Sequence, residues 1–152
     1  MKLYLIQHGE AKPETEDPER SLTAKGEEEV RRVATAAKRM GIRASRIYHS
    51  GKWRAQQTAE IMASTLTLPA ESFRGLNPLD DVRPWAERIS SETEDLMIVG
   101  HLPFLEKLAS LLLCGDESAR VVLFRYGAIV HLDQKEDQTW AVRWILTPEM
   151  VS

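Results

Sequence analysis

Short apolar runs alternate along this chain with segments whose apolar residues recur at helical spacing. The two clearest runs, Leu3–Ile6 and Leu96–Val99, are almost free of polar residues. Runs of this kind are typical of strands that are buried on both faces of a parallel sheet. A shorter run at Ile47–Ser50 predicts another strand, and Glu71–Phe73 is a candidate for a further short one.

Helical periodicity fills the intervals between these strands. The apolar residues from Val30 to Ala37 follow the i, i+3, i+4, i+7 rule of an amphipathic helix. We expect this helix to begin at Thr23, which is a favourable capping residue, and to end at Gly41. Three further helices are expected over residues 52–66, over residues 81–90 and in the leucine-rich segment after His101.

The C-terminal part has a different pattern. Segments rich in β-forming residues at Ala128–Leu132 and Trp140–Leu146 flank a polar stretch, which predicts an antiparallel hairpin. Strands that alternate with helices favour a three-layer α/β/α sandwich with a mostly parallel sheet of about six strands. No linker or internal repeat divides the sequence, so we expect a single domain over residues 1–152.

Composition and charge argue against several classes of protein. The chain has 152 residues, of which 43% are hydrophobic and 28% charged, as is ordinary for a folded domain. Its net charge of −3 and its lack of a long basic run argue against nucleic-acid binding. No apolar run approaches the roughly 20 residues of a membrane span, and the N-terminal one is too short for a signal peptide. We therefore expect a cytoplasmic protein, and nothing in the sequence requires more than a monomer.

The single cysteine, Cys114, cannot form an internal disulfide. It follows three leucines at the expected end of a helix. A small buried apolar residue is the favoured interpretation here, in preference to a nucleophilic thiol.

Polar side chains with catalytic potential follow three of the expected strands. His8 comes after the first strand, Arg54 after the second and His101 after the Leu96–Val99 strand. Ligands of open α/β sheets bind beyond the carboxyl ends of the strands. If the three strands are neighbours, two histidines and an arginine converge on one crevice.

This trio suits phosphoryl transfer. Neutral imidazole is a nucleophile near neutral pH, and attack by His8 on phosphorus would give a phosphohistidine intermediate. Arg54 could hold the phosphate oxygens, and a protonated His101 could stabilise their negative charge. Gly9 could let the backbone approach the phosphate closely. Each of these residues, taken alone, has an ordinary alternative as a surface or core-edge residue.

Two histidines could also bind a metal ion. No His-x-His or His-Glu-x-x-His spacing is present, so the sequence gives a zinc site weak support. The two other histidines, His49 and His131, fall inside strand-like segments, where structural roles are the favoured interpretation.

Four segments carry a resemblance to a known family. In chain order these are Leu5–Ala11, Arg20–Gly26, Ser50–Ala59 and Val99–Pro103. They resemble, respectively, the Arg-His-Gly signature, the Leu-Thr-x-x-Gly helix start, the Ser-x-x-x-Arg-Ala-x-x-Thr-Ala block and the second-histidine block of the histidine phosphatase (phosphoglycerate mutase-like) superfamily. Together they span almost the whole chain.

The short length and the His-Gly-Glu-Ala and His-Leu-Pro forms most resemble the SixA branch, the protein phosphohistidine phosphatases, which lack the large cap insertion of the mutases. The resemblance implies that His8 is the nucleophile, that Arg54 and His101 bind phosphate, and that no metal or other cofactor is needed. It also implies a phosphorylated partner protein of the histidine-phosphotransfer type, as in signal transduction. A small phosphorylated substrate is the alternative.

One position departs from the family pattern, because Gln7 stands where the family has an arginine before the nucleophile. A charge-assisted hydrogen bond worth roughly 1.5–3 kcal/mol is therefore missing or replaced. Arg20 lies where this branch carries an arginine near the pocket and could replace it, while Gln7 and Gly9 are further candidates for phosphate binding. The alternative is a weakly active or non-catalytic module that binds phosphorylated ligands.

The proton donor for the leaving group is open at this point. Glu10, Asp80 and Asp81 are candidates by position, and a solvated loop acid is an equally good interpretation of each. A phosphohistidine substrate relaxes the need for such a donor, because imidazole leaves more easily than an alkoxide.

Overall fold

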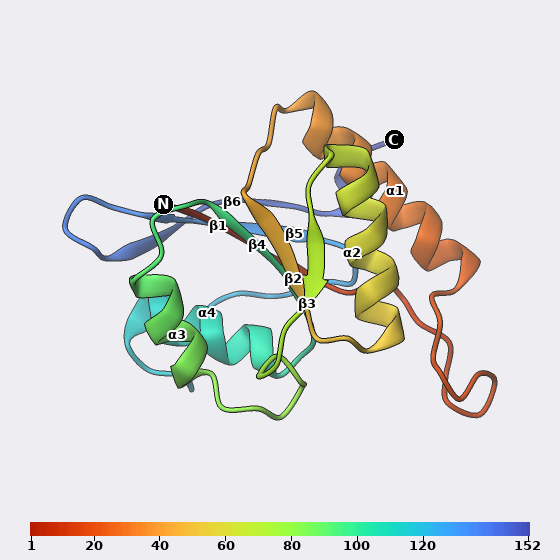
Figure 1. Cartoon of the computed structure of the whole chain (residues 1–152), viewed down its shortest axis with the longest axis horizontal. Helices are drawn as coiled ribbons and strands as arrows, with labels where there is room; N and C mark the ends of the chain where they lie inside the picture. Colours follow the sequence, from red (N-terminus) through yellow and green to blue (C-terminus); the bar gives the residue numbers. More distant parts are fainter.

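The computed structural model describes residues 1–152, and helices cover both faces of its single six-stranded sheet (Figure 1). The three-layer α/β/α sandwich expected from the sequence is confirmed. The strands are β1 (Lys2–Gln7), β2 (Arg46–His49), β3 (Ala70–Ser72), β4 (Leu96–Gly100), β5 (Ile129–Gln134) and β6 (Trp140–Leu146). The helices are α1 (Ala24–Arg39), α2 (Trp53–Leu66), α3 (Arg83–Ser90) and α4 (Phe104–Cys114), with a 3-10 turn at Pro148–Met150.

The strand order places the expected site residues together. It runs β3-β2-β4-β1-β5-β6, and the first four strands are parallel. Because β4 pairs with both β1 and β2, the strands that precede His8, Arg54 and His101 are neighbours. Their carboxyl ends therefore meet at one edge of the sheet. Strand β5 runs antiparallel to β1 and pairs with β6, which confirms the C-terminal hairpin.

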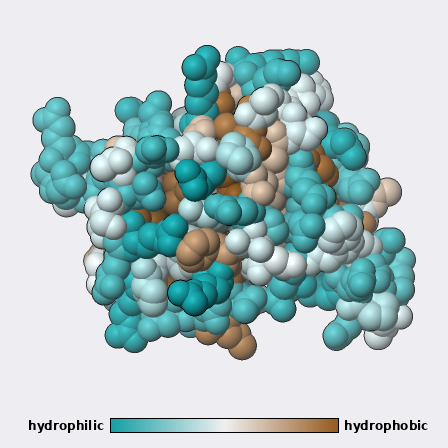
Figure 2. All heavy atoms as spheres, in the orientation of Figure 1, coloured by the Kyte–Doolittle hydropathy of each residue, from teal (hydrophilic) through white to brown (hydrophobic).

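Each central strand contributes to two hydrophobic cores. On β1, Leu3 and Leu5 pack with the α3 and α4 layer, whereas Tyr4 and Ile6 pack with the α1 and α2 layer. The continuous apolar run follows from this burial on both faces, because successive strand residues point to opposite sides. The face in Figure 2 is largely hydrophilic, as expected when helices cover the sheet.

The helix α1 begins and ends close to the predicted residues. Thr23 is its N-cap, and the Thr23 Oγ1 accepts the Gly26 N–H at 2.9 Å. Met40 closes the last turn, and Gly41 follows with a φ of +73°, a left-handed conformation that glycine adopts at little cost.

Four expectations need correction. Helix α3 begins at Arg83, because Asp81 accepts the Arg83 N–H at 3.1 Å in a turn that precedes the helix. Strands β2 and β3 each begin and end one residue earlier than predicted, β2 at Arg46 and His49 and β3 at Ala70 and Ser72. The prediction of a buried Cys114 is wrong: its side chain is exposed, because it lies in the last turn of α4. None of the helices has the length and apolar character needed to cross a bilayer.

Candidate active site

His8 follows β1 and is held in one tautomer. Its side chain is only 6% exposed, and its Nδ1 lies 2.7 Å from the Gly9 carbonyl oxygen. A carbonyl oxygen can only accept, so Nδ1 carries the proton and the lone pair lies on Nε2. Burial lowers the pKa of His8 to about 4; the hydrogen bond to Gly9 opposes this shift, and the charges of Arg54 and Arg20 add to it. His8 is therefore a neutral base at neutral pH.

His101 follows β4 and lies beside His8. The two ring centroids are 5.0 Å apart, and the His101 Nε2 is 2.6 Å from the Ser50 Oγ. Burial lowers the pKa of His101 to about 3, with further lowering by His8 and Arg54. The free site therefore contains a neutral His101, and the protonated His101 expected from the sequence is not its resting form. A bound phosphate dianion would favour the protonated form.

The turn after β2 places the Ser50 hydroxyl beside His101. Gly51 adopts a φ of +88°, and its N–H donates to the Nδ1 of His49 at 3.1 Å. His49 thus has the structural role expected of it. Sequence reasoning assigned Ser50 no role, and its only signal was its place at the start of the Ser-x-x-x-Arg motif.

Arg54 lies in the first turn of α2 and has no acidic partner. Its Nε is buried without a hydrogen bond, and burial and the nearby Arg20 lower its pKa. One turn later, the Thr58 Oγ1 donates to the Arg54 carbonyl at 2.9 Å and accepts the Gly9 N–H at 3.0 Å. The Arg-x-x-x-Thr spacing therefore ties this helix to the segment that carries His8. A desolvated, unpaired guanidinium is a favourable position for an anion.

Gly9 is required by packing against α1. A side-chain carbon at Gly9 would lie 2.8 Å from Val30 Cγ2, and one at Gly26 would collide with the backbone of Glu10. The N–H of Gly9 is already bound to Thr58. Close packing of the β1 exit on α1 thus explains both glycines without a bound phosphate.

Arg20 reaches the site from the loop between β1 and α1. Its φ of +52° is unusual for a residue with a side chain, and its Nε donates to the Lys12 carbonyl at 3.1 Å. Its positive charge lowers the pKa of His8, of His101 and of Arg54. The structure therefore brings Arg20 together with the three residues singled out from the strand ends.

Arg20 and Arg54 border an open pocket of about 520 Å³. It lies between the loop that carries Arg20 and the first turn of α2. Its lining residues are Glu14, Pro18, Glu19, Arg20, Gly51, Lys52, Trp53 and Arg54.

Tyr126 is a neighbour of the site that sequence reasoning missed. Its ring centroid lies 5.5 Å from that of His8, and its side chain is 42% exposed. The adjacent Arg125 binds Glu29 of α1 at 2.7 Å and Glu149 at 2.6 Å, which fixes the segment that carries Tyr126. No sequence motif marks Tyr126, because its position depends on the ion pairs that the adjacent Arg125 forms with Glu29 and Glu149.

Comparison with known proteins identifies the family. The model of the histidine phosphatase superfamily (branch 1) matches residues 3–81. An uncharacterised protein of Picosynechococcus is 32% identical over 96% of this chain and 99% of its own length. The chain belongs to the histidine phosphatase superfamily. Members of this superfamily are phosphatases, and the resemblance noted from the four motifs is confirmed.

Two comparisons place this histidine phosphatase near SixA. The phosphohistidine phosphatase SixA of Escherichia coli is 27% identical over 97% of this chain and 94% of its own length. A structure of the protein histidine phosphatase SixA complexed with tungstate superposes with a TM-score of 0.87, 26% identity and 99% coverage of both chains. The α-ribazole phosphatase of Shigella flexneri shares the fold, with a TM-score of 0.81, 18% identity and 97% coverage of both chains.

The other residues predicted to bind phosphate or to donate a proton in this histidine phosphatase have different positions. Gln7 is buried at the end of β1, where its carbonyl accepts the Gly127 N–H at 2.9 Å. The Glu10 carboxylate accepts a hydrogen bond from the Thr23 hydroxyl at 3.0 Å, at the start of α1. Asp80 and Asp81 line a different pocket, beside α3.

The electrostatic setting of the two histidines is positive. The charged residues that shift their pKa values are Arg20, Lys52 and Arg54, and none is a carboxylate. No group of three or more His, Cys, Asp and Glu side chains in the structure could hold a metal ion. The site is therefore built to receive an anion.

Proposed function

We propose that this chain is a phosphohistidine phosphatase that removes phosphate from a histidine of a partner protein through a phospho-His8 intermediate. The proposal rests on the tautomer and the protonation state of His8. Its Nδ1–H donates to the Gly9 carbonyl at 2.7 Å, which leaves the Nε2 lone pair free. Its pKa, lowered to about 4, keeps that lone pair unprotonated at neutral pH. Full-length similarity to SixA supports the choice of substrate.

The reaction follows in two displacements. His8 Nε2 attacks phosphorus, a new P–N bond forms, and the P–N bond to the substrate imidazole breaks, with a proton from water completing the released imidazole. A water molecule then attacks the phosphorus of phospho-His8 and the P–N bond breaks, which releases inorganic phosphate and returns His8 to its neutral form. The attacking water gives one proton to solvent, which replaces the proton taken up by the leaving imidazole in the first step. Arg54 and Arg20 stabilise the charge on the equatorial oxygens in both steps. Throughout, the Nδ1–H stays bound to Gly9.

Two acids singled out as proton donors are held by other residues, which supports a P–N substrate; Glu14 and Glu19 are the acids that line the pocket. The carboxylate of Glu10 is bound to Thr23 and that of Asp81 is bound to Arg83. An alkoxide leaving group needs a nearby acid, whereas imidazole leaves without one far more readily. The tungstate bound by the related SixA is a tetrahedral oxyanion, which supports phosphate as the group that the arginines hold.

A substrate panel tests this proposal. Purified protein is mixed with a phosphorylated histidine-phosphotransfer domain, with phosphoramidate and with the alkyl ester glycerol 2-phosphate, and phosphate release is measured. We expect release from the two P–N substrates and a loss of at least about a thousandfold in His8→Ala. The matched control is His131→Gln, because His131 is a buried histidine that packs against Tyr4 and Trp144.

Each other outcome supports a different account. A preference for the phosphate ester would favour a small-molecule phosphomonoesterase. Release from no substrate would favour a module that binds phosphorylated ligands, as Gln7 allows. Release that survives His8→Ala would exclude His8 as the nucleophile.

A further inference from the structure

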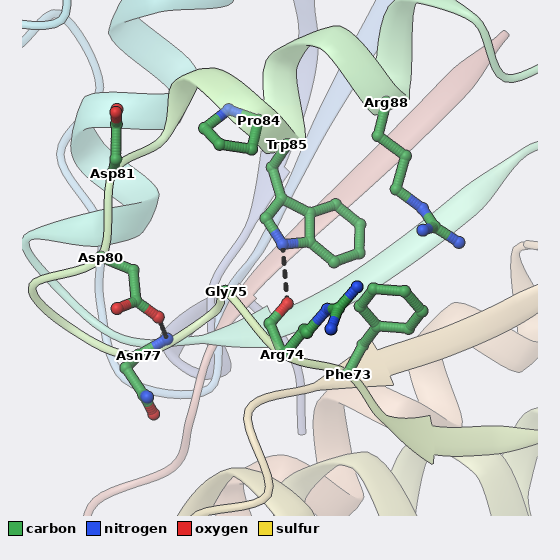
Figure 3. Close-up of a pocket in the computed structure, with 9 residues that line it drawn as sticks. All are labelled: Phe73, Arg74, Gly75, Asn77, Asp80, Asp81, Pro84, Trp85 and Arg88. Carbon is green, nitrogen blue, oxygen red and sulfur yellow. Dashed lines mark hydrogen bonds between the residues drawn. The ribbon is translucent and has the colours of Figure 1, made fainter.

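A second pocket of about 540 Å³ lies between the loop after β3 and helix α3 (Figure 3). The proposed reaction does not use it. Its lining residues are Phe73, Arg74, Gly75, Asn77, Asp80, Asp81, Pro84, Trp85 and Arg88.

Arg88 in this pocket is held among aromatic rings. Its guanidinium carbon lies 4.2 Å from the Phe73 ring centroid, 5.2 Å from that of Trp85 and 5.3 Å from that of Tyr48. Its Nη2 donates to the Tyr48 hydroxyl at 3.1 Å, and its Nε is buried without a partner. A guanidinium fixed in this way loses little conformational entropy when its free N–H groups bind an anion.

The pocket has two ends of opposite charge. In Figure 3 the side chains of Arg74 and Arg88 lie on the Phe73 side, and those of Asp80 and Asp81 lie on the opposite side. Asp81 pairs with Arg83 at 3.2 Å, whereas neither Arg74 nor Arg88 forms an ion pair. The arginine end therefore suits a planar anion, and a carboxylate matches the guanidinium fork.

This pocket opens beside the phosphate pocket. Strands β2 and β3 are paired, and the Phe73 N–H donates to the His49 carbonyl at 2.9 Å. Neighbouring strands lie about 4.8 Å apart, and both strands run in the same direction. The phosphate pocket is lined by Gly51 and Lys52 after β2, and the second pocket by Phe73 and Arg74 after β3. Both pockets therefore lie at the same edge of the sheet, where one bound protein can contact both.

We propose that the Arg88 pocket binds an acidic side chain of the phosphorylated partner protein while its phosphohistidine occupies the His8 pocket. This inference rests on the proposed function for the identity of the partner. The carboxylate site itself rests on the unpaired, aromatic-stacked guanidinium. Arg88 is then a specificity residue for protein substrates and takes no part in the chemistry at phosphorus.

A binding titration tests the site without catalysis. Propionate, which mimics a glutamate side chain, is titrated into the ¹⁵N-labelled full chain, with neutral propionamide and inorganic phosphate as comparison probes. We expect propionate to shift the Arg88 Nε–H and Trp85 indole N–H resonances saturably, and propionamide to leave them unchanged. If propionate moves neither resonance, or inorganic phosphate binds there more tightly, the carboxylate site is wrong whatever the activity of the enzyme.

Two variants connect the titration to Arg88. Arg88→Met keeps the long apolar stem and should abolish the propionate shift at Trp85. The matched control is Arg46→Met, because Arg46 also lies over the Tyr48 ring, at 6.0 Å, but at the opposite end of β2. It should leave the shift intact.

Steady-state kinetics test whether the Arg88 pocket binds the partner protein. With the phosphorylated histidine-phosphotransfer domain, Arg88→Met should raise KM about tenfold with little change in kcat, and Arg88→Lys should lie between it and the wild type. With phosphoramidate, KM should be unchanged. Equal losses on both substrates, or no loss on either, would overturn the inference. A wild-type chain inactive on both would instead refute the proposed function, and the propionate titration would still decide the carboxylate site.

Discussion

Two guanidinium groups near His8, those of Arg20 and Arg54, form no ion pair. Arg54 is partly desolvated in the first turn of α2, and Arg20 extends from a loop residue with a φ of +52°. A left-handed conformation at a residue with a side chain costs on the order of 1 kcal/mol, so the surrounding loop must hold it. Asp17 does so by accepting hydrogen bonds from the backbone N–H groups of Glu19 and Ser21.

We predict that Arg20 supplies the positive charge that is missing because Gln7 stands where the family has an arginine. Arg20→Ala should weaken tungstate binding by at least about tenfold, because a charge-assisted hydrogen bond to the oxyanion is lost. Isothermal titration calorimetry measures this, with Arg31→Ala as the control, since Arg31 is an exposed arginine on α1. Unchanged tungstate affinity in Arg20→Ala would show that Arg20 does not supply the missing charge.

The residues that sequence could identify are those marked by local pattern. His8 and His101 follow buried strands, and Arg54 falls in a motif with helical spacing. Ser50 and Tyr126 could not be assigned, because their roles depend on contacts with His101 and His8 that only the tertiary structure creates.

At the scale of elements, the exit of β1 packs closely on α1. Gly26 lies in the first turn of α1, where a side-chain carbon would overlap the Glu10 backbone. Thr23 caps the same helix and also binds the Glu10 carboxylate. The Leu-Thr-x-x-Gly motif therefore fixes the loop that carries Arg20 relative to His8.

We predict that Gly26→Ala destabilises the protein and loosens the site. The overlap with Glu10 backbone atoms should lower the free energy of unfolding by about 1–3 kcal/mol, measured by urea denaturation. Tungstate affinity should fall as well, since the Arg20 loop is displaced. Lys25→Ala, at an exposed neighbouring position, is the control and should change neither quantity. A fully stable Gly26→Ala would contradict the close contact.

In the fold as a whole, the alternation of apolar runs and helical segments is sufficient to predict the layers and the hairpin. From sequence, the strand ends meet only on the condition that the three strands are neighbours. Nothing in the sequence shows that β4 lies between β1 and β2. The pocket around Arg88 was not foreseen, since it needs three aromatic residues from β2, the loop after β3 and α3 to meet.

The burial of all four histidines predicts how stability depends on pH. Burial lowers the pKa of His8 to about 4 and of His101 to about 3, and it also lowers the pKa values of His49 and His131. Between pH 6.5 and pH 4 the unfolded chain therefore binds more protons than the folded one. The free energy of unfolding should fall as the pH decreases through this window, with His8 alone contributing on the order of 3 kcal/mol.

Urea denaturation at a series of pH values checks this dependence. The double variant His8→Gln, His101→Gln should show a shallower slope than the wild type. A wild-type stability that stays flat or rises on acidification would contradict the burial of neutral imidazoles.

The covalent intermediate on His8 can be trapped. The enzyme is mixed with the phosphorylated histidine-phosphotransfer domain, quenched within milliseconds in alkaline denaturant, which preserves P–N bonds, and analysed by peptide mass spectrometry. We predict a phosphoryl group on His8 that forms and decays within a turnover and is absent from His8→Ala. A phosphoryl group found instead on His101, or turnover by His8→Ala, would exclude His8 as the nucleophile.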